Sequence, residues 1–361
     1  MNYAPQRTKT AAMNEGMEVK TDHRRLWLAS VGGLLSGAVY AALLYLLARL
    51  PWFPSGFVSA SGLLGTPLVI GAVCVGLSSP TQQASVVYRC LAPWLSIALV
   101  YVGFALVKLE TLICLIMLAP VTMGMATLGG ALTGKIMHHL RQRKALQRGV
   151  LGCFVLLPLL CSQWEAHWQV PELRHTVSDR IVIDASPTQV WHGLLNVPDI
   201  QRQELSWSFS HAIGLPRPLA AKLSGTGEGA VRDLYWEGGI HFREYVTTWE
   251  PAQRLAYRVD VSPAREALRH LDTHVVIGDR YFDIENGEYR LRDLGNGRTE
   301  LSLSTTYRMR TMVNPYGEWW ANRTLDDFHT VVLRLLKQRV EHCLENSVTL
   351  DENAPGFCRL G

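Results

Sequence analysis

The stretch Ile181-Val-Ile-Asp-Ala-Ser-Pro-Thr-Gln-Val-Trp191 decides the fold of the C-terminal half of this chain. It begins inside an alternating run, Arg180–Asp184, which predicts a β-strand. Ser186 and Pro187 then predict the start of a helix, because serine caps free N–H groups and proline fits the first helical position. The sequence therefore predicts a strand that passes directly into a short helix.

Further short alternating runs, separated by turn residues, follow from about residue 230. The expected strands are Ala230–Trp236, Ile240–Trp249, Leu255–Val261, Asp279–Ile284, Glu288–Asp293 and Arg298–Met309. Asn286-Gly287 and Asn296-Gly297 stand between the last three runs, and Asn-Gly is a strong hairpin signal. Alternation of this kind predicts antiparallel strands with one covered face.

A long helix is expected to cover that face. Asn314 caps it, Pro315 starts it, and it should end near Glu345. Its apolar stripe at helical spacing consists of Leu325, Phe328, Val332, Leu335, Leu336 and Cys343. Such a stripe is wide enough to lie on a sheet.

This order of elements resembles the SRPBCC superfamily, which has the START-like or helix-grip fold. Ile181–Trp191 looks like the opening strand and first helix of that family, and Glu244–Pro251 with Arg254–Val259 looks like its central hairpin. The likeness is greatest to the branch of polyketide cyclase/dehydrase and lipid transport proteins. It covers about residues 174–345, and departs from the family pattern between Val197 and Gly229, which is longer.

The resemblance implies an α+β fold, with a seven-stranded antiparallel sheet around the long C-terminal helix. It also implies an apolar cavity that binds a hydrophobic small molecule, such as a lipid, quinone or polyketide. The residues expected at that cavity are Tyr257, His274, Tyr281, Tyr289, Tyr307, Trp319, Trp320, Phe328 and His329. Any one of them could instead simply fill the core.

Catalytic signatures are absent from the sequence. It has no GxSxG elbow, HExxH motif, phosphate loop or dinucleotide fingerprint, and no Cys/His spacing of metal-site type. We therefore expect a binding protein without cofactor, metal or catalytic residues. The alternative is a cyclase- or hydrolase-type enzyme that uses the same cavity, with Glu244, His274 and His329 as acid–base candidates.

The N-terminal half has a different composition. Residues 1–170 hold 13 Lys and Arg against 5 Asp and Glu, whereas residues 171–361 hold 22 against 26. The basic excess therefore belongs to loops that flank membrane spans, and nucleic-acid binding is not expected. Five apolar runs approach the ~20 residues that cross a bilayer: about 26–50, 59–79, 91–107, 111–134 and 147–164.

These runs divide the chain into an N-terminal tail (1–25), a transmembrane helical region (26–165), the START-like domain (174–345) and a C-terminal tail (346–361). Lys and Arg gather before the first run, at Arg89 and between Lys135 and Arg148, which places these segments in the cytoplasm. With five spans in a cell membrane, the START-like domain lies outside the cytoplasm, which is the periplasm if the organism is a Gram-negative bacterium. If the fifth run only lies on the surface, the domain is cytoplasmic.

Two further expectations concern partners and cysteines. The small residues Gly129, Gly130, Ala131 and Gly134 suit close helix packing, and they leave open a sensor or assembly subunit with membrane-protein partners, or a homo-oligomer. In an oxidising compartment, Cys343 and Cys358 are candidates for a disulfide. The alternative is a buried thiol at Cys343 and a free one in the tail.

Overall fold

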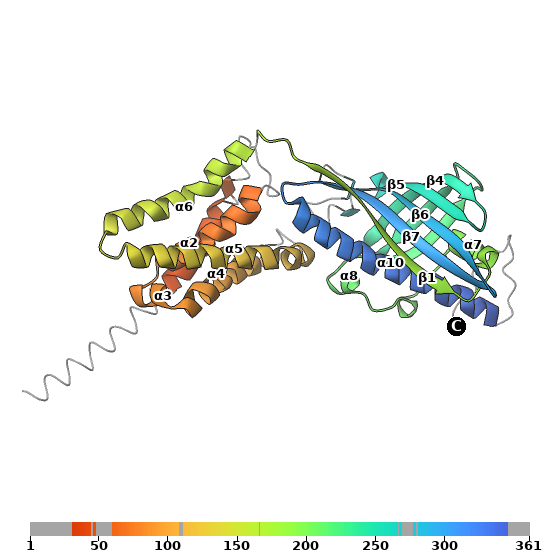
Figure 1. Ribbon diagram of the computed structural model, residues 1–361, viewed down its shortest axis with the longest axis horizontal. Helices are drawn as coiled ribbons and strands as arrows, with labels where there is room; N and C mark the ends of the chain where they lie inside the picture. Colours follow the sequence, from red (N-terminus) through yellow and green to blue (C-terminus); the bar gives the residue numbers. More distant parts are fainter. Residues whose placement is uncertain are drawn as a thin grey trace, which may run out of the picture. The chain divides into compact units, whose positions relative to one another are not determined.

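The computed structural model describes residues 31–44, 46–47, 60–107, 111–165, 167–265, 267–268, 277–278 and 281–345. They form two compact units: the first draws on residues 1–109 and 117–168, and the second on residues 110–116 and 169–361. The first unit is helical, and the second combines one antiparallel sheet with the long helix α10 (Asn314–Glu345) (Figure 1). Each unit is described by itself.

Three helices of the first unit are long and apolar enough to cross a membrane by length and composition: α4 (Val86–Leu106), α5 (Leu112–His139) and α6 (Lys144–Glu165). The apolar helices Val31–Leu44 and Ser61–Gly76 are shorter, the second comprising η1 (Ser61–Gly65) and α2 (Thr66–Gly76). Within the described residues, three helices therefore have the length and composition of membrane spans, where the sequence predicts five spans.

The second predicted span, 59–79, corresponds to the shorter apolar helix Ser61–Gly76. Its predicted last residue, Ser79, instead caps the short helix α3 (Pro80–Ala84), with its side chain accepting from the Gln82 backbone N–H. The first predicted span, 26–50, lies partly outside the described residues, as does the predicted hairpin tip at Lys108–Glu110.

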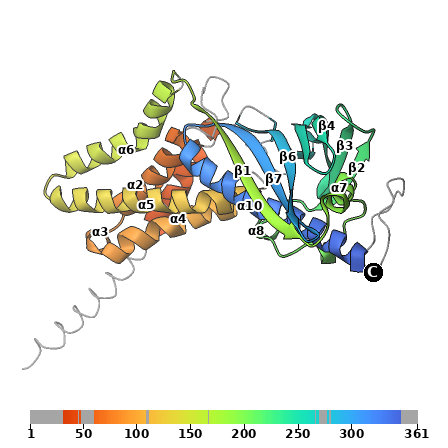
Figure 2. The same ribbon diagram turned by 45° about the vertical axis from the view of Figure 1, so that its right-hand side comes forward.

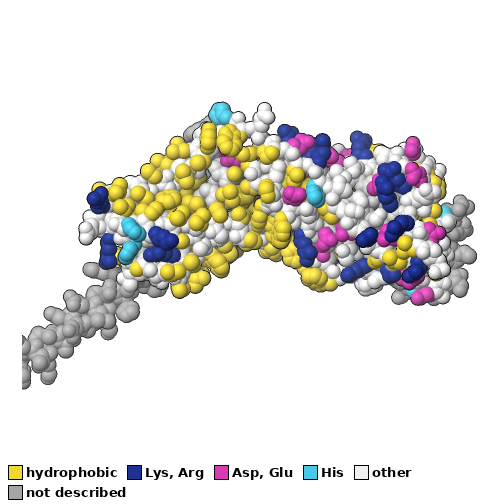
Figure 3. Space-filling model, in the orientation of Figure 1, with side chains coloured by type: hydrophobic (Ala, Val, Ile, Leu, Met, Phe, Trp, Pro, Cys, Tyr) yellow, Lys and Arg dark blue, Asp and Glu magenta, His cyan; other side chains and the backbone are white. Residues whose placement is uncertain are grey.

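The surface of this unit is apolar. Leu95, Val102 and Leu160 are exposed large hydrophobic residues on its helices. On the face seen in Figure 3 its side chains are mostly hydrophobic or uncharged. An apolar exterior of this extent is typical of a lipid-facing surface.

The predicted small-residue packing is present inside the unit. A Cβ at Gly129 of α5 would overlap the Leu68 carbonyl of α2, and one at Gly71 of α2 would overlap the Ala126 carbonyl of α5. Only glycine at these positions allows the two backbones to approach so closely.

The second unit contains a seven-stranded antiparallel sheet. Its strands are β1 (Glu172–Ile183), β2 (Pro218–Ser224), β3 (Val231–Trp236), β4 (Ile240–Glu250), β5 (Arg254–Asp260), β6 (Phe282–Gly295) and β7 (Arg298–Arg310). Their spatial order is β1-β7-β6-β5-β4-β3-β2. Both ribbon views show α10 running along the concave side of this sheet (Figures 1 and 2). The arrangement fits the helix-grip fold that the sequence predicts.

The predicted hairpin at Asn286-Gly287 is wrong, because β6 runs through both residues. Gly287 pairs with Tyr257 of β5, and a Cβ at Gly287 would overlap the Tyr257 ring. Gly287 therefore leaves room for the ring from the neighbouring strand while its own strand stays extended. The Asn-Gly dipeptide alone does not distinguish this role from a hairpin turn.

The sheet still has the predicted seven strands. Two predicted strands form the single strand β6, but a further strand lies in the segment that departs from the family pattern. β2 lies between Val197 and Gly229, and its backbone pairs with β3. The hairpin at Asn296-Gly297 is confirmed, since both residues have positive φ, 54° and 68°. The same segment also contains η2 (Arg202–Glu204) and α8 (Phe209–Ala212).

The stretch that opens the domain folds as predicted. Ser186 caps α7 (Pro187–Leu195) through a reciprocal capping box with Gln189. Val190, Trp191 and Leu194 on this helix are buried in the main hydrophobic core, between the sheet and α10. Burial of such side chains stabilises the fold by about 1.5–3 kcal/mol each.

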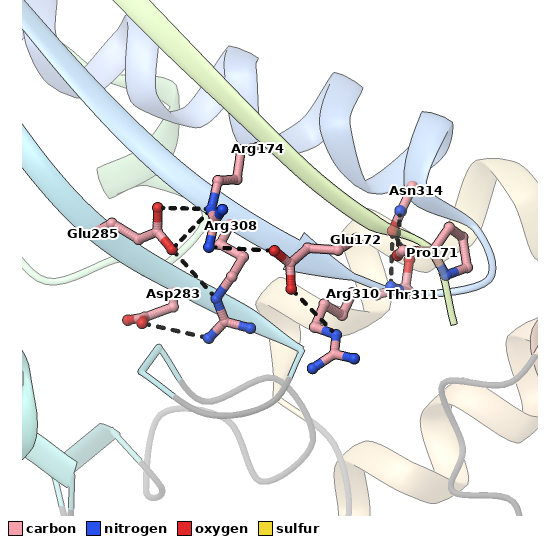
Figure 4. A network of polar contacts seen from close by, with 9 residues as sticks. All are labelled: Pro171, Glu172, Arg174, Asp283, Glu285, Arg308, Arg310, Thr311 and Asn314. Carbon is pink, nitrogen blue, oxygen red and sulfur yellow. Dashed lines mark hydrogen bonds and ion pairs between the residues drawn. The ribbon is translucent and has the colours of Figure 1, made fainter. Parts of the chain in front are cut away.

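A polar network fixes the start of β1 to the neighbouring elements (Figure 4). Glu172 pairs with Arg174 at 3.3 Å and with Arg310 of β7 at 3.6 Å. The Asn314 side-chain amide at the start of α10 donates to the Pro171 carbonyl at 2.9 Å. The chain therefore enters the domain at the point where β7 ends and α10 begins.

Candidate ligand-binding site

The inner face of the sheet, the face along which α10 runs, is the candidate site. Strand alternation brings Arg232 of β3, Glu244 of β4, Tyr257 of β5 and Tyr289 of β6 together on it. α10 packs closely against β1 and β7 but makes few close backbone approaches to β3, β4 or β5. Side chains therefore span the space between α10 and these three strands.

A buried ion pair lies on this face. Arg232 Nη1 donates to Glu244 Oε2 at 2.9 Å, and the two side chains are 4% and 7% exposed. Arg232 Nη2 donates to the Leu194 carbonyl at 3.1 Å, at the C-terminal end of α7, where the helix dipole favours a cation. Arg232 Nε, by contrast, has no hydrogen-bond partner in the described part of the chain.

The surroundings set the charges of this cluster. Burial opposes the charge of Arg232, but Glu244 raises the pKa of Arg232 above its usual value. Burial raises the pKa of Glu244, against the opposing effects of Arg232 and of a hydrogen bond with Tyr257. Burial also raises the pKa of Tyr257 and Tyr289, so both phenols stay neutral donors. The cluster is a polar patch in an apolar interior.

An aromatic cluster occupies the neighbouring part of the inner face. The Trp236 ring lies 5.0 Å from the Phe328 ring of α10 and 5.8 Å from the Phe242 ring of β4, between centroids. Trp236 Nε1 is buried and has no hydrogen-bond partner among the described residues. The inner face thus combines aromatic surface with buried donors for which the described residues supply no acceptor.

Two carboxylates fasten the Val197–Gly229 segment to α10. Glu204 of η2 receives bonds of 2.9 and 2.8 Å from Arg339, which also donates to the Pro198 and Asp199 carbonyls. Asp327 receives bonds from the Ser208 hydroxyl and the Ser210 backbone N–H, at 2.5 and 2.9 Å. Burial opposes the charge of Asp327, but these bonds lower its pKa below the usual value.

His329 fastens α10 to the sheet on the other side. Its Nδ1 lies 2.7 Å from Asp179 Oδ2 of β1, and its Nε2 lies 2.8 Å from Thr305 Oγ1 of β7. Burial lowers the pKa of His329 to about 4, against the opposing effect of Asp326. The imidazole is therefore neutral at pH 7, with Nδ1–H donating to Asp179 and Nε2 accepting from the Thr305 hydroxyl.

Four of the predicted cavity residues lie at the inner face. Tyr257 and Tyr289 belong to the polar cluster, with ring centroids 6.0 Å apart, and Phe328 belongs to the aromatic cluster. Trp320 is buried and stacks on Phe209 of α8, with its own Nε1 lacking a partner in the described residues.

The other predicted cavity residues lie away from the space between α10 and β3–β5. Tyr307 is fully buried between β7 and α10, where its hydroxyl donates to Asn322, and His329 serves as a fastening. Trp319 is 59% exposed, and Tyr281 lies half-buried just before β6. His274 lies outside the described residues.

Sequence reasoning missed Arg232, Trp236 and Arg339 as site or fastening residues. Arg232 and Trp236 stand four residues apart on β3, so alternation alone places them on one face. Arg339 stands three residues after Leu336 and four before Cys343, inside the apolar stripe of α10. A cation within such a stripe is a readable signal of a buried ion pair.

Only one of the two cysteines of the predicted disulfide lies within the described residues. Cys343 is fully buried on α10 and is disulfide-bonded. Cys358 lies outside the described residues, so its pairing with Cys343 stays a prediction. Across the part of the chain that the structure describes, no group of three His, Cys, Asp or Glu side chains is placed to hold a metal ion.

Comparison with known proteins finds no matching family model and no matching curated protein. Solved structures similar to this chain include the Zhui aromatase/cyclase from Streptomyces sp. R1128, with 17% identity over 48% of this chain and 96% of that one, at a TM-score of 0.30. Ara h 8.0201 has 9% identity over 46% and 98%, at 0.28. DynU16, from the dynemicin biosynthetic locus, has 18% over 48% of both chains, at 0.27.

At identities and TM-scores this low, these likenesses carry no argument about activity. The helix-grip assignment of the C-terminal domain rests instead on its own strand order and on α10.

Proposed function

We propose that this chain is a membrane-anchored protein whose C-terminal domain binds a hydrophobic small molecule at the inner face of its sheet. The bilayer and the bound molecule are its expected partners. The observation that carries the proposal is the pair of buried donors on β3, Arg232 Nε and Trp236 Nε1, neither of which has an acceptor among the described residues.

A buried donor without a partner costs about 1–3 kcal/mol, so native interiors rarely retain one without a reason. A ligand with oxygen acceptors would satisfy both donors. Its apolar body would lie against Trp236, Phe242 and Phe328, in the region where α10 makes few close backbone approaches to β3–β5. Apolar and aromatic surface with a few placed polar groups is the usual composition of a ligand site.

The anchoring part of the proposal is supported by α4, α5 and α6, which have the length and composition of membrane spans. We also propose that the N-terminus and the segment between α5 and α6 are cytoplasmic, because basic residues gather before the first apolar run and between these two helices. The C-terminal domain then lies outside the cytoplasm if α6 crosses the membrane, and inside it if α6 lies on the surface.

The direct test is mass spectrometry of small molecules extracted from the full-length protein, purified from native membranes in detergent. We expect a hydrophobic compound with oxygen acceptors in the wild type, and at least a tenfold loss of it in Trp236→Leu. The matched control is Tyr235→Leu, which changes the exposed aromatic residue beside Trp236 on the opposite face of β3. Equal recovery of the compound from wild type and Trp236→Leu would refute binding at this face.

A second candidate function is a cyclase-type reaction in the same place. The observation in its favour is Glu244, whose pKa burial raises, in hydrogen-bond contact with Tyr257. A carboxyl group with increased proton affinity suits general acid–base work. If the wild type converts the extracted compound over time, Glu244→Gln should retain the compound and stop its conversion.

A further inference from the structure

Two tryptophans of the C-terminal domain are largely exposed to solvent. Trp207, just before α8, is 79% exposed, and Trp319, in the second turn of α10, is 59% exposed. A chain of aromatic contacts joins their positions. The Trp319 and Trp320 ring centroids lie 4.8 Å apart, and Trp320 stacks on Phe209 at 6.4 Å, two residues after Trp207.

These residues share one side of the domain. Ser208 and Ser210, on either side of Phe209, are both bonded to Asp327 of α10. The docking face, defined as Trp207 and Trp319, therefore lies where these bonds join the α8 segment to α10. Arg323 follows Trp319 by four residues, so it lies next to it along the helix, and its side chain is 64% exposed.

A short linker joins α6 to this part of the domain. Six residues separate the end of α6 at Glu165 from the start of β1 at Glu172, a span of at most about 20–25 Å. Pro171 in this linker accepts a hydrogen bond from Asn314, the first residue of α10. Trp319 lies only five residues further along that helix, or about 7.5 Å.

We propose that Trp207 and Trp319 dock the domain on the interfacial region of the bilayer that carries the protein. Tryptophan is enriched at membrane–water interfaces, where its ring is apolar and its N–H remains hydrated. Arg323 beside Trp319 is exposed and pairs with the exposed Asp326 at 3.7 Å; on the bilayer it would supply a cation for lipid phosphates. The short linker keeps the effective concentration of the bilayer at this face high, an advantage that no free partner shares.

Docking of this kind rests on the membrane anchoring proposed above, but not on the bound molecule. It adds a route for that molecule, because Trp320 joins the exposed pair to the interior and carries a buried Nε1 without a partner in the described residues. A lipid-soluble ligand would pass from the interface to the inner face without crossing bulk water.

The test uses the full chain in nanodiscs of phosphatidylcholine and phosphatidylglycerol, prepared with or without brominated acyl chains, which quench tryptophan within the bilayer. The double variant Trp207→Phe with Trp319→Phe removes two of the eleven tryptophans. We measure how much tryptophan emission brominated lipid quenches in each protein. The quenched emission should be smaller in the variant than in the wild type, by most of the emission that the two substitutions remove. The matched control is Trp191→Phe with Trp249→Phe, a core pair 5.3 Å apart, whose loss should leave the quenched emission unchanged.

If the quenched emission is the same in wild type and the Trp207/Trp319 variant, the docking face does not touch lipid and the inference fails. It also fails if the variant instead changes the number of chains per nanodisc, because the face then binds a second copy. Release of the wild type from native membranes by alkaline carbonate would refute the anchoring and the docking together. Retention with unchanged quenching would refute the docking alone.

Discussion

The two buried Arg–Glu pairs of the domain interior differ in how completely their arginines are hydrogen-bonded. On the α10 side, Arg339 makes four hydrogen bonds of 2.8–3.2 Å to Glu204, Pro198 and Asp199. On the β3–β4 side, Arg232 also pairs with a buried glutamate, but its Nε has no partner in the described residues.

The difference separates two roles of one residue pair. A buried Arg–Glu pair holds elements together when every donor is satisfied, because breaking it leaves an uncompensated charge. A pair in which one arginine N–H has no partner can donate a hydrogen bond to a ligand. We therefore assign the α10 side to fastening and the β3–β4 side to the ligand, and the two sides should respond differently to substitution.

The largest effect is expected at Arg339. Arg339→Met leaves Glu204 buried without a countercharge and should lower the free energy of unfolding by about 3–5 kcal/mol. Urea denaturation of the full-length protein in detergent, followed by tryptophan fluorescence, measures this change. The control is Arg334→Met, an exposed position on the same helix, which should stay within about 0.5 kcal/mol of wild type.

An Arg339→Met variant as stable as Arg334→Met would contradict the fastening role. A loss of bound ligand at unchanged stability would assign this pair to the ligand instead.

A smaller effect is expected from the second fastening, at His329. Burial lowers its pKa to about 4, so the unfolded chain, with an ordinary pKa of 6.5, binds the proton more tightly. The contribution of His329 is therefore complete above pH 6.5 and is lost as the pH falls towards 4. Between pH 7 and pH 5 the loss should be about 2 kcal/mol.

The measurement is urea denaturation at both pH values for wild type and His329→Gln, which has no proton to gain. The variant should be less stable at pH 7 but lose about 2 kcal/mol less on acidification. His211→Gln is the comparison, because burial also lowers the pKa of His211. The same pH dependence in His329→Gln as in wild type would show that this imidazole is not held neutral.

The smallest effect on stability is expected at Arg232. After Arg232→Met, Glu244 can take up a proton, since burial already raises its pKa, and Tyr257 remains bonded to it. We expect a loss of about 2 kcal/mol or less in the free energy of unfolding. Retention of the extracted compound should nevertheless fall at least tenfold.

The double variant Arg232→Met with Glu244→Met sharpens this expectation. It removes both charges, so stability should return towards the wild-type value while binding stays lost. Recovery of binding together with stability would mean that Arg232 acts only through the fold.

The sequence by itself determined the elements that local chemistry fixes. Ser186 and Pro187 start α7, Asn296-Gly297 turns the β6–β7 hairpin, and α10 runs from Asn314 to Glu345 as predicted. Each of these depends on residues close together in the chain, through capping, positive φ or helical spacing. The apolar composition likewise predicted membrane helices.

Where two sequence signals were equally strong, only the tertiary structure decided which prediction was right. Asn286-Gly287 carries the same turn signal as Asn296-Gly297, but it stays extended because the Tyr257 ring of β5 lies over Gly287. Arg232 and Arg339 both meet a glutamate distant in sequence, and only their surroundings show which guanidinium is fully bonded. Long-range packing sets these outcomes, because a side chain's partners across a sheet are not encoded in its neighbours along the chain.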